Sequence, residues 1–324
     1  MKSIILRGPA GRSGAPARRT ASAGIAMAVA GAVILPGTTA TAGTAEAVGS
    51  RPVTAARVGT ASAEGAYWHT RTLTTYTRPR PLGRGANRYR VVERELLEEW
   101  TARDGESWSG VRKLGVRPAT AADERAWRRD GSPTTWKDGG LRLSTRPDAG
   151  ALNKTRNVTG FYLVERWRPY REIQGLPTEP EALKAWIKKA ARNAPNPDDE
   201  PEARIPEEIL DGYTAEVLVS LLYSVPVSKA VRTAAYRALP TLPGVRPLSG
   251  VKDPQGRAGR GFLIERDHRG SASEVRTVVD TGAMTLLSEH HESGESGKPA
   301  IKDRTSVILE AGWTDDRPSV PALP

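Results

Sequence analysis

The chain of 324 residues has no cysteine, only two phenylalanines, and no acidic residue before Glu46. The absence of cysteine excludes disulfides and also excludes a lipid-modified N-terminal cysteine. A protein without disulfides depends on a hydrophobic core, and a chain of this length is long enough to bury one. The apolar run Ala21–Leu35 ends at Pro36 and is too short to span a bilayer comfortably.

The N-terminus instead has the features of an export signal. Five basic residues precede or border the apolar run, and the small residues Ala40-Thr41-Ala42 follow it. We therefore predict a signal peptide over residues 1–42, cleaved after Ala42, and a secreted or extracytoplasmic protein. The alternative is a retained segment that anchors the protein in the membrane.

The net charge of +11 overstates the basicity of the exported chain. Five of the 48 Lys and Arg residues lie in the predicted signal, which leaves 43 basic against 37 acidic residues, a balance of +6. A mild positive excess outside the cytoplasm favours lipid headgroups, wall polymer or an envelope protein as partners, and not nucleic acid.

Composition and turn signals divide the remaining chain. Residues 43–65 are mostly small and polar, which is typical of a flexible tether, and residues 317–324 are expected to be a disordered tail. Between them, residues 66–316 predict one α+β domain, in which a curved antiparallel sheet resembling a half-barrel packs on several helices. Strands are predicted at Tyr67–Thr77, Phe161–Arg168, Val245–Val251, Gly261–Arg266, Val275–Asp280, Met284–His290 and Ser306–Trp313.

The segment 90–115 permits two interpretations. Glu95-Leu96-Leu97-Glu98-Glu99 favours a helix by propensity, but Asp104-Gly105 is typical of a two-residue type I′ hairpin turn. We predict the hairpin, with Arg103 opposite Glu106 and Thr101 opposite Trp108.

Four helices are indicated by their caps and apolar spacing. Thr120 is the expected cap of a helix over Ala121–Asp130, and Ser228 is the expected cap of a helix ending before Pro240. Thr178-Glu179-Pro180-Glu181 predicts a capping box for a third helix, and a fourth runs from about Glu207 to Tyr223. Residues 133–160 are expected to be irregular.

Several local phrases of the sequence stand out together. They are Asp123–Trp127 with Gly131-Ser132-Pro133 and Trp136, Leu176–Leu183, Val231–Leu239 with Leu242–Val245, Asp253–Arg257, and Asp280-Thr281-Gly282. With these phrases the chain resembles a large family of uncharacterised actinobacterial envelope proteins that is known by a locus-tag name. The resemblance covers roughly 67–313 and implies an external domain, membrane-anchored in many relatives. The element order is also similar to that of lipoprotein-carrier and sigma-regulator half-barrel proteins, a likeness of fold alone.

No catalytic or metal-binding set emerges from the sequence, and we expect no cofactor. Asp280-Thr281-Gly282 spells the aspartic-protease triplet, but a second copy is missing and the context favours a hairpin turn. His290 and His291 are adjacent in a predicted strand, so their side chains point to opposite faces and cannot share one ion.

Tryptophan and arginine supply the only candidate binding residues. Indoles on a sheet can hold sugar rings or acyl chains, although core packing is the simpler interpretation. A basic loop is a candidate contact for an anionic surface, with a solvated loop as the alternative. The candidate lining residues are Trp100, Trp108, Trp127, Trp136 and Trp167, and the basic residues are Arg78, Arg80, Arg84, Arg88 and Arg90.

Three functions are compatible with these features. The first is a non-enzymatic envelope protein that binds an amphiphile or lipid on its sheet. The second is a regulatory or sensory ectodomain that acts through protein contacts. The third, a cell-wall hydrolase, has no residue set in its favour.

Overall fold

The computed structural model describes residues 64–138, 140–155, 159–193, 205, 207–268, 271–295 and 302–324. The predicted signal peptide lies outside these residues, as does nearly all of the predicted tether over 43–65. Among the described residues, no helix combines the length and the apolar character needed to cross a membrane.

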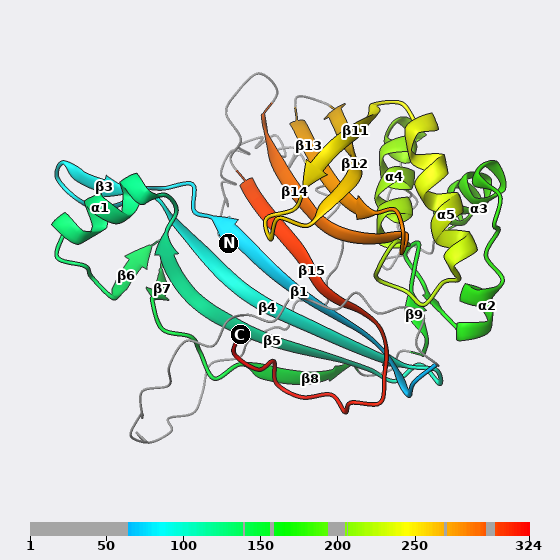
Figure 1. Ribbon diagram of the computed structural model, residues 1–324, viewed down its shortest axis with the longest axis horizontal. Helices are drawn as coiled ribbons and strands as arrows, with labels where there is room; N and C mark the ends of the chain where they lie inside the picture. The colour runs from blue at the N-terminus through cyan, green and yellow to red at the C-terminus, as the bar shows by residue number, and fades with distance from the viewer. Residues whose placement is uncertain are drawn as a thin grey trace, which may run out of the picture. The chain divides into compact units, whose positions relative to one another are not determined.

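A nine-stranded sheet forms the centre of the fold (Figure 1), and all of its neighbouring strands are antiparallel. The first and last strands of the chain pair with each other in the middle of the sheet, and the described part of the sheet is not closed into a barrel. The strand order is β11 (Val245–Lys252), β12 (Ala258–His268), β13 (Ser271–Asp280), β14 (Thr285–Glu295), β15 (Lys302–Thr314), β1 (Tyr67–Thr77), β4 (Val91–Ala102), β5 (Ser107–Pro118) and β8 (Ala151–Thr155).

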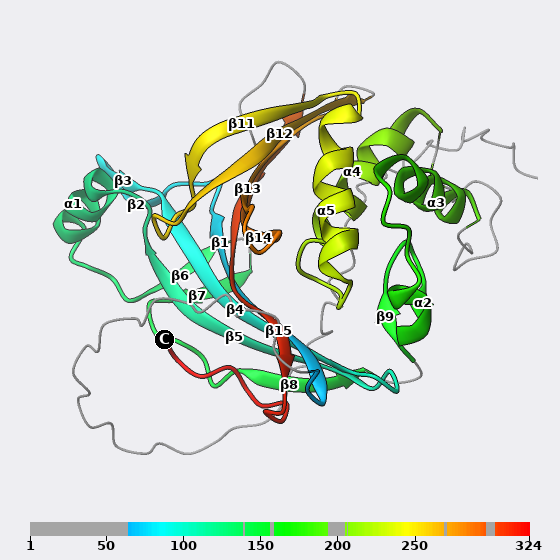
Figure 2. The ribbon, with the colours of Figure 1, turned by 45° about the vertical axis from the view of Figure 1, so that its right-hand side comes forward.

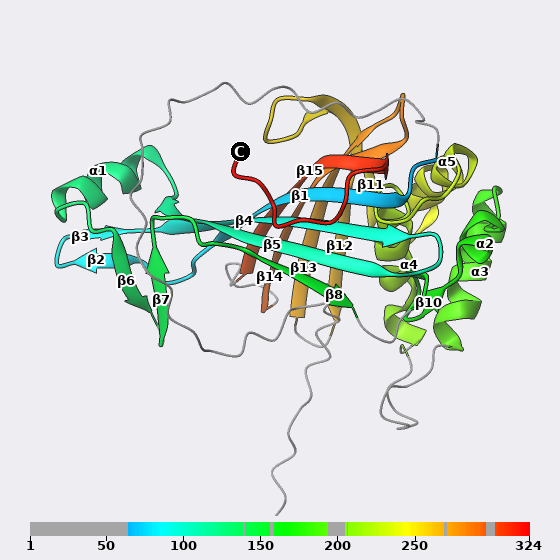
Figure 3. The ribbon, with the colours of Figure 1, turned by 90° about the horizontal axis from the view of Figure 1, so that it is seen from below.

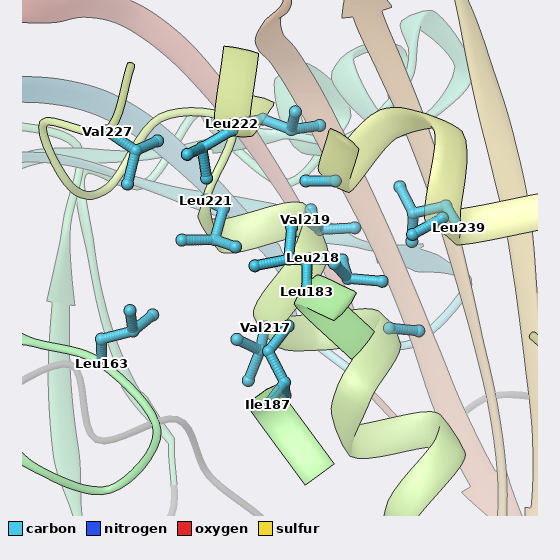
Figure 4. Packing of buried hydrophobic residues seen from close by; sticks show 14 of the residues in the cluster. Leu163, Leu183, Ile187, Val217, Leu218, Val219, Leu221, Leu222, Val227 and Leu239 are labelled. Atoms are coloured by element: carbon cyan, nitrogen blue, oxygen red, sulfur yellow. The ribbon is translucent and has the colours of Figure 1, made fainter. Parts of the chain in front are cut away.

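The helices pack at one end of the sheet (Figure 2). Their apolar side chains form the main hydrophobic cluster with residues of β1, β12, β13, β14 and β15, including Trp68, Phe262 and Ile308. Figure 4 shows the leucines and valines of this cluster. We call the face of the sheet that carries these residues the inner face. The helices are α2 (Tyr170–Gln174), α3 (Pro180–Arg192), α4 (Leu210–Ser220) and α5 (Lys229–Ala238), with short 3-10 turns η2 (Glu207–Ile209) and η3 (Leu239–Thr241).

A smaller substructure lies at the opposite end of the sheet (Figure 1). Its elements come from the chain segments that connect β1 to β4 and β5 to β8. Its own core contains Tyr89, Val91 and Leu143, with Trp127 and Trp136 packed against it. The hydroxyl of Tyr89 donates to Asp130 at 3.1 Å and accepts from Trp136 Nε1 at 2.9 Å. The elements are β2 (Leu82–Arg84), β3 (Asn87–Tyr89), α1 (Ala121–Arg129), β6 (Thr135–Asp138) and β7 (Leu141–Ser144).

The hairpin prediction is confirmed, but its register was wrong by one residue. Trp100 pairs with Trp108, and Thr101 pairs with Ser107. Ala102 N donates to Glu106 O at 2.8 Å, and only Gly105 has positive φ in the turn. The connection is therefore a three-residue loop with a bulge at glycine rather than a type I′ turn, a choice that the Asp-Gly pair alone does not decide.

Other predictions were right in kind and wrong in detail. The first strand has the predicted bounds, and Thr120 forms the expected box with Asp123. The helix at 180 begins with proline and has no side-chain cap, since Glu179 takes the cap position. The predicted strand over 161–168 is two short strands, β9 (Phe161–Tyr162) and β10 (Trp167–Arg168), and residues 133–160 contain β6, β7 and β8 instead of being irregular.

The C-terminal segment is also a correction. Residues 317–324 were expected to be disordered, but they lie on the outer face of β1, β4 and β5 (Figure 3). Pro321 is buried, and the guanidinium of Arg71 donates to the carbonyl of Ala322 at 3.2 Å. A Cβ on Gly110 would lie 2.8 Å from Ser319 O, so a glycine at this position allows the segment to approach the sheet.

Strands β14 and β15 separate near the helices (Figure 1). Their pairing ends at Ser288 and Val307, and beyond it Arg257 Nη2 donates to the carbonyls of Leu287 (3.0 Å) and Ile308 (2.9 Å). The buried carboxylate of Asp253 accepts a hydrogen bond from Arg257 Nε at 2.7 Å and so orients the Arg257 guanidinium. The Asp253–Arg257 phrase therefore links two strands whose own hydrogen bonds have ended.

Candidate functional site

Away from the main hydrophobic cluster, the inner face carries polar residues in ordered rows. Directly paired residues of antiparallel strands share a face, so a row can be followed from strand to strand. The first row contains Glu289, Ser306, Thr74, Glu95 and Lys113. The second contains His291, Arg304, Tyr76 and Glu93, and a third contains Ala311, Thr70, Glu99 and Ser109.

An apolar row lies between the first and third of these rows. It contains Ile308, Thr72, Leu97 and Val111, of which Leu97 and Val111 are half-buried. The inner face therefore alternates along the strands from polar to apolar to polar. A surface of this kind is complementary to a molecule that has both characters.

Glu289 is a paired carboxylate. His291 Nε2 lies 3.2 Å from Glu289 Oε1, and Arg304 Nη2 lies 3.4 Å from the same oxygen. Burial acts to raise the pKa of Glu289, but the interactions with His291 and Arg304 outweigh it, and the pKa is lowered below the ordinary value. These interactions therefore favour the ionised form of Glu289.

Glu99 is the opposite case. Burial raises the pKa of Glu99 above its ordinary value, and a hydrogen bond with Thr70 only partly opposes this. No positively charged residue is among the groups that shift the pKa of Glu99. Among the described residues, no Lys, Arg or His forms an ion pair with Glu99, so this poorly solvated carboxyl group has no paired cation there, an arrangement that costs stability.

Tyr223 brings these two carboxylates into one site. It follows α4, and this connection is fixed to the sheet because Trp68 Nε1 donates to Tyr223 O at 3.3 Å and Leu286 N donates to Leu222 O at 3.4 Å. Burial, followed by the negative charges of Glu289 and Glu99, raises the pKa of the Tyr223 phenol. Its hydroxyl therefore lies within the electrostatic influence of both glutamates.

The two glutamates do not form a hydrolytic pair. Glu99 is on β4 and Glu289 is on β14, which places three strand spacings between them, about 14 Å at the backbone. Glycoside hydrolases hold their carboxyl groups about 5 to 9.5 Å apart. Neither carboxylate is among the groups that shift the pKa of the other. The geometry suits binding better than general acid–base chemistry.

The five candidate tryptophans do not meet in one place. Trp100 and Trp108 are cross-strand partners on the outer face, and Trp100 is only 2% exposed. Trp127 and Trp136 pack on the small core around Tyr89, and Trp167 contacts Tyr162 at the surface beside the helices. The five tryptophans therefore do not surround one shared space; Trp100 is buried, and Trp127 and Trp136 pack against the small core, as the core-packing interpretation expects.

The basic loop also lies away from the inner-face site. Arg80, Arg84, Arg88 and Arg90 are exposed around the β2–β3 hairpin, at the end of the sheet opposite the helices (Figure 1). Arg78 is more enclosed and pairs with Glu93 at 3.1 Å. These residues therefore lie away from the inner-face residues around Tyr223.

The two motifs considered for catalysis have structural explanations. The carboxylate of Asp280 accepts hydrogen bonds from Gly282 N (2.8 Å) and Ala283 N (3.1 Å), as expected of a turn. His290 contacts Thr305 on the outer side of the strand pair, whereas His291 contacts Glu289 on the inner face. The described residues contain no cluster of His, Asp and Glu suited to hold a metal ion.

Sequence reasoning missed Glu99, Glu289, Arg304 and Tyr223 as a group. Glu99, Glu289 and Arg304 lie on β4, β14 and β15, and only the strand register places them on one face, whereas Tyr223 lies in the connection after α4. Alternation within the strand offered one usable signal, because Glu95, Leu97 and Glu99 share a face once the segment is assigned as a strand. Comparison with known proteins finds no matching family model and no matching curated protein.

Proposed function

We propose that this protein is a non-enzymatic binding domain of the cell envelope that holds an amine-bearing amphiphile on its inner face. The carrying observation is Glu99, a poorly solvated carboxyl group with a hydroxyl partner and no cation among the groups that shift its pKa. An ammonium group of a ligand would offset the cost of ionising Glu99 there, which makes the site complementary to a positive charge.

The remaining residues fit the rest of such a molecule. Tyr223 offers a hydroxyl group to a polar headgroup, whereas Thr74 and Ser306 are buried and their hydroxyl groups lie 3.5 Å from each other. Leu97 and Val111 offer apolar contact beside it. This differs from the tryptophan-lined surface suggested by sequence, because polar rows and not indoles form the binding face.

The proposal also includes that the protein is exported and that it belongs to the family that its sequence resembles. An exported domain with a curved, half-barrel-like sheet would fit the actinobacterial envelope family that the sequence resembles, and binding an amphiphile would suit that location. The fold supports the coarser statement of a large antiparallel sheet with helices at one end. The signal at 1–42 is the feature that favours export over a cytoplasmic role.

The test is native mass spectrometry of the protein purified from the culture medium of its own host. We expect a chain that begins at or near Gly43 and carries a bound amphiphile. Glu99→Gln and Tyr223→Phe should lower the bound fraction, because each removes one polar contact while keeping the shape of the side chain.

Matched controls are available on the same molecule. Glu106→Gln changes an exposed glutamate that pairs with Lys154 at 2.5 Å, and Tyr67→Phe changes a tyrosine that packs on Trp108 on the outer face. Both controls should leave the bound fraction unchanged. A ligand-free wild-type protein, or equal binding by the Glu99→Gln variant, would contradict the proposal.

A regulatory ectodomain is the second candidate, and one observation favours it. Tyr162 and Trp167, on the β9–β10 hairpin, are 38% and 37% exposed, and their rings contact each other at 5.3 Å. Exposed neighbouring aromatic side chains are typical of protein contact sites. If this role is correct, a Tyr162→Ser/Trp167→Ser variant should lose an envelope protein that crosslinks to the wild type, while its inner-face ligand is retained.

A further inference from the structure

The positive charge of the chain is concentrated in one small part of the fold. We call residues 78–90 and 117–146 the basic lobe; it contains the β2–β3 hairpin, α1 and the β6–β7 hairpin. The lobe holds twelve Lys and Arg residues and four Asp and Glu residues, a balance of +8. Since residues 43–324 carry +6, the rest of that chain has a balance of −2.

The basic and acidic residues of the lobe also differ in their exposure to solvent. Eleven of the twelve basic residues are exposed, whereas none of the four acids is. Asp123 accepts from Thr120 and Arg90 N, Asp130 accepts from the Tyr89 hydroxyl, Glu124 pairs with Arg128, and Asp138 lies 3.9 Å from Arg78. Asp123, Asp130 and Asp138 therefore serve the internal structure of the lobe, Glu124 forms a surface pair with Arg128, and the cations face solvent.

The lobe presents these cations on a fixed scaffold. Trp136, Tyr89 and Asp130 form a chain of hydrogen bonds through its core, and Trp127 Nε1 donates to Pro133 O at 3.0 Å. α1 packs on β3 and β5, which joins the lobe to the main sheet. A preorganised cationic surface gains more from a flat anionic partner than a disordered basic segment does, because less entropy is lost on binding.

An apolar side chain distinguishes a membrane from a soluble polyanion as the partner. Leu141 is 56% exposed, the largest fraction among the exposed large hydrophobic residues of the described chain. It begins β7 at the turn of the β6–β7 hairpin, where its cross-strand partner is Asp138; the exposed residues Lys137 and Arg142 pair with each other on the opposite face of the hairpin. An exposed leucine at the tip of a hairpin of the basic lobe gains nothing from a dissolved phosphate polymer, but it is stabilised when it enters the interface of a bilayer.

We propose that the basic lobe docks on an anionic phospholipid surface, with the cations against the headgroups and Leu141 inserted at the interface. Each exposed Lys or Arg near such a surface contributes attraction that adds to the apolar contact of the leucine. Docking by this end directs the helix end of the same domain away from the bilayer (Figure 1). The proposal is independent of the ligand on the inner face.

Vesicle flotation with residues 43–324 tests this proposal. The wild type should float with vesicles of phosphatidylcholine and phosphatidylglycerol, should not float with phosphatidylcholine alone, and should be released by salt. Arg80→Gln/Arg84→Gln should weaken binding about 30-fold, since each neutralised charge accounts for a factor of about five. Leu141→Ser should weaken it on the order of tenfold.

The matched control is Arg171→Gln/Arg237→Gln, which removes the same charge from exposed positions on α2 and α5. It should bind as the wild type does. Equal loss in this control would mean that net charge alone drives binding and would overturn the docking site. Loss in Arg80→Gln/Arg84→Gln with full binding by Leu141→Ser would also overturn it, in favour of a phosphate polymer, which binding to soluble polyphosphate would then confirm.

Discussion

Glu98 and Glu99 are neighbours in the chain, but they lie on opposite faces of the sheet and differ in the charged groups that surround their carboxylates. On the outer face, His69 Nε2 and Arg71 Nε lie 3.2 and 3.3 Å from the carboxylate of Glu98, and the C-terminal segment covers the region. On the inner face, Glu99 has the hydroxyl of Thr70 and no such cations. Strand alternation therefore separates a carboxylate paired with cations from one that we propose binds a ligand.

The same contrast extends along both faces. The outer face combines Trp100, stacked on His69 at 4.9 Å, with an ion-paired cluster and a covering segment that includes Pro321. The inner face, beyond the helices, combines hydroxyl and carboxyl groups with half-buried Leu97 and Val111. Substitutions on the outer face should therefore lower stability, and substitutions on the inner face should chiefly lower binding.

The largest effect is expected for Trp100→Ala. Because Trp100 is 2% exposed and lies under the C-terminal segment, its removal should leave a cavity and lower the free energy of unfolding by about 3 to 5 kcal/mol. Denaturant unfolding measures this value. Trp167→Ala, at a position that is 37% exposed, should cost much less. A similar loss of unfolding free energy in both variants would show that Trp100 is not packed more tightly than Trp167.

A smaller but still large effect is expected for Gly105→Val. Gly105 has a φ of +98°, and a Cβ there would lie 2.0 Å from Gly160 N, so both backbone strain and a steric clash oppose the substitution. We expect a loss of about 3 kcal/mol in unfolding free energy. The Gly131→Val control also has positive φ but meets no atom within 4 Å, so it measures the strain alone. Equal losses in the two variants would remove the role assigned to the contact with Gly160.

The positions of strands were predicted better from the sequence than the hairpin register and the packing of the C-terminal segment. Tyr67–Thr77 alternates β-branched and aromatic residues, and its bounds were predicted correctly because that pattern is local. The register at Gly105 was missed because Asp-Gly fits two loop lengths that differ by one residue. The C-terminal segment was missed because its burial depends on a glycine in β5, more than 200 positions earlier in the chain.

The candidate site was beyond the reach of sequence for a related reason. Glu99, Tyr223 and Glu289 are brought together by strand order and by the anchoring of the connection after α4, neither of which is a local property. The high tryptophan content reflects side-chain packing and did not indicate the candidate site. The exposed arginines were identified correctly as surface residues, but their location at the far end of the sheet required the fold.

The central claim is most directly tested by the pH dependence of unfolding free energy in the wild type, Glu98→Gln and Glu99→Gln. Because the pKa of Glu99 is raised in the folded state, its contribution to stability is present below the ordinary glutamate pKa and is lost as pH rises through the folded value. Glu99→Gln should therefore become more stable than the wild type toward neutral pH, by about 1 kcal/mol. Glu98→Gln, which weakens the contacts with His69 and Arg71, should be less stable at neutral pH by about 2 kcal/mol. If Glu99→Gln is destabilised at neutral pH as Glu98→Gln is, then Glu99 is a structural residue and the binding account is wrong.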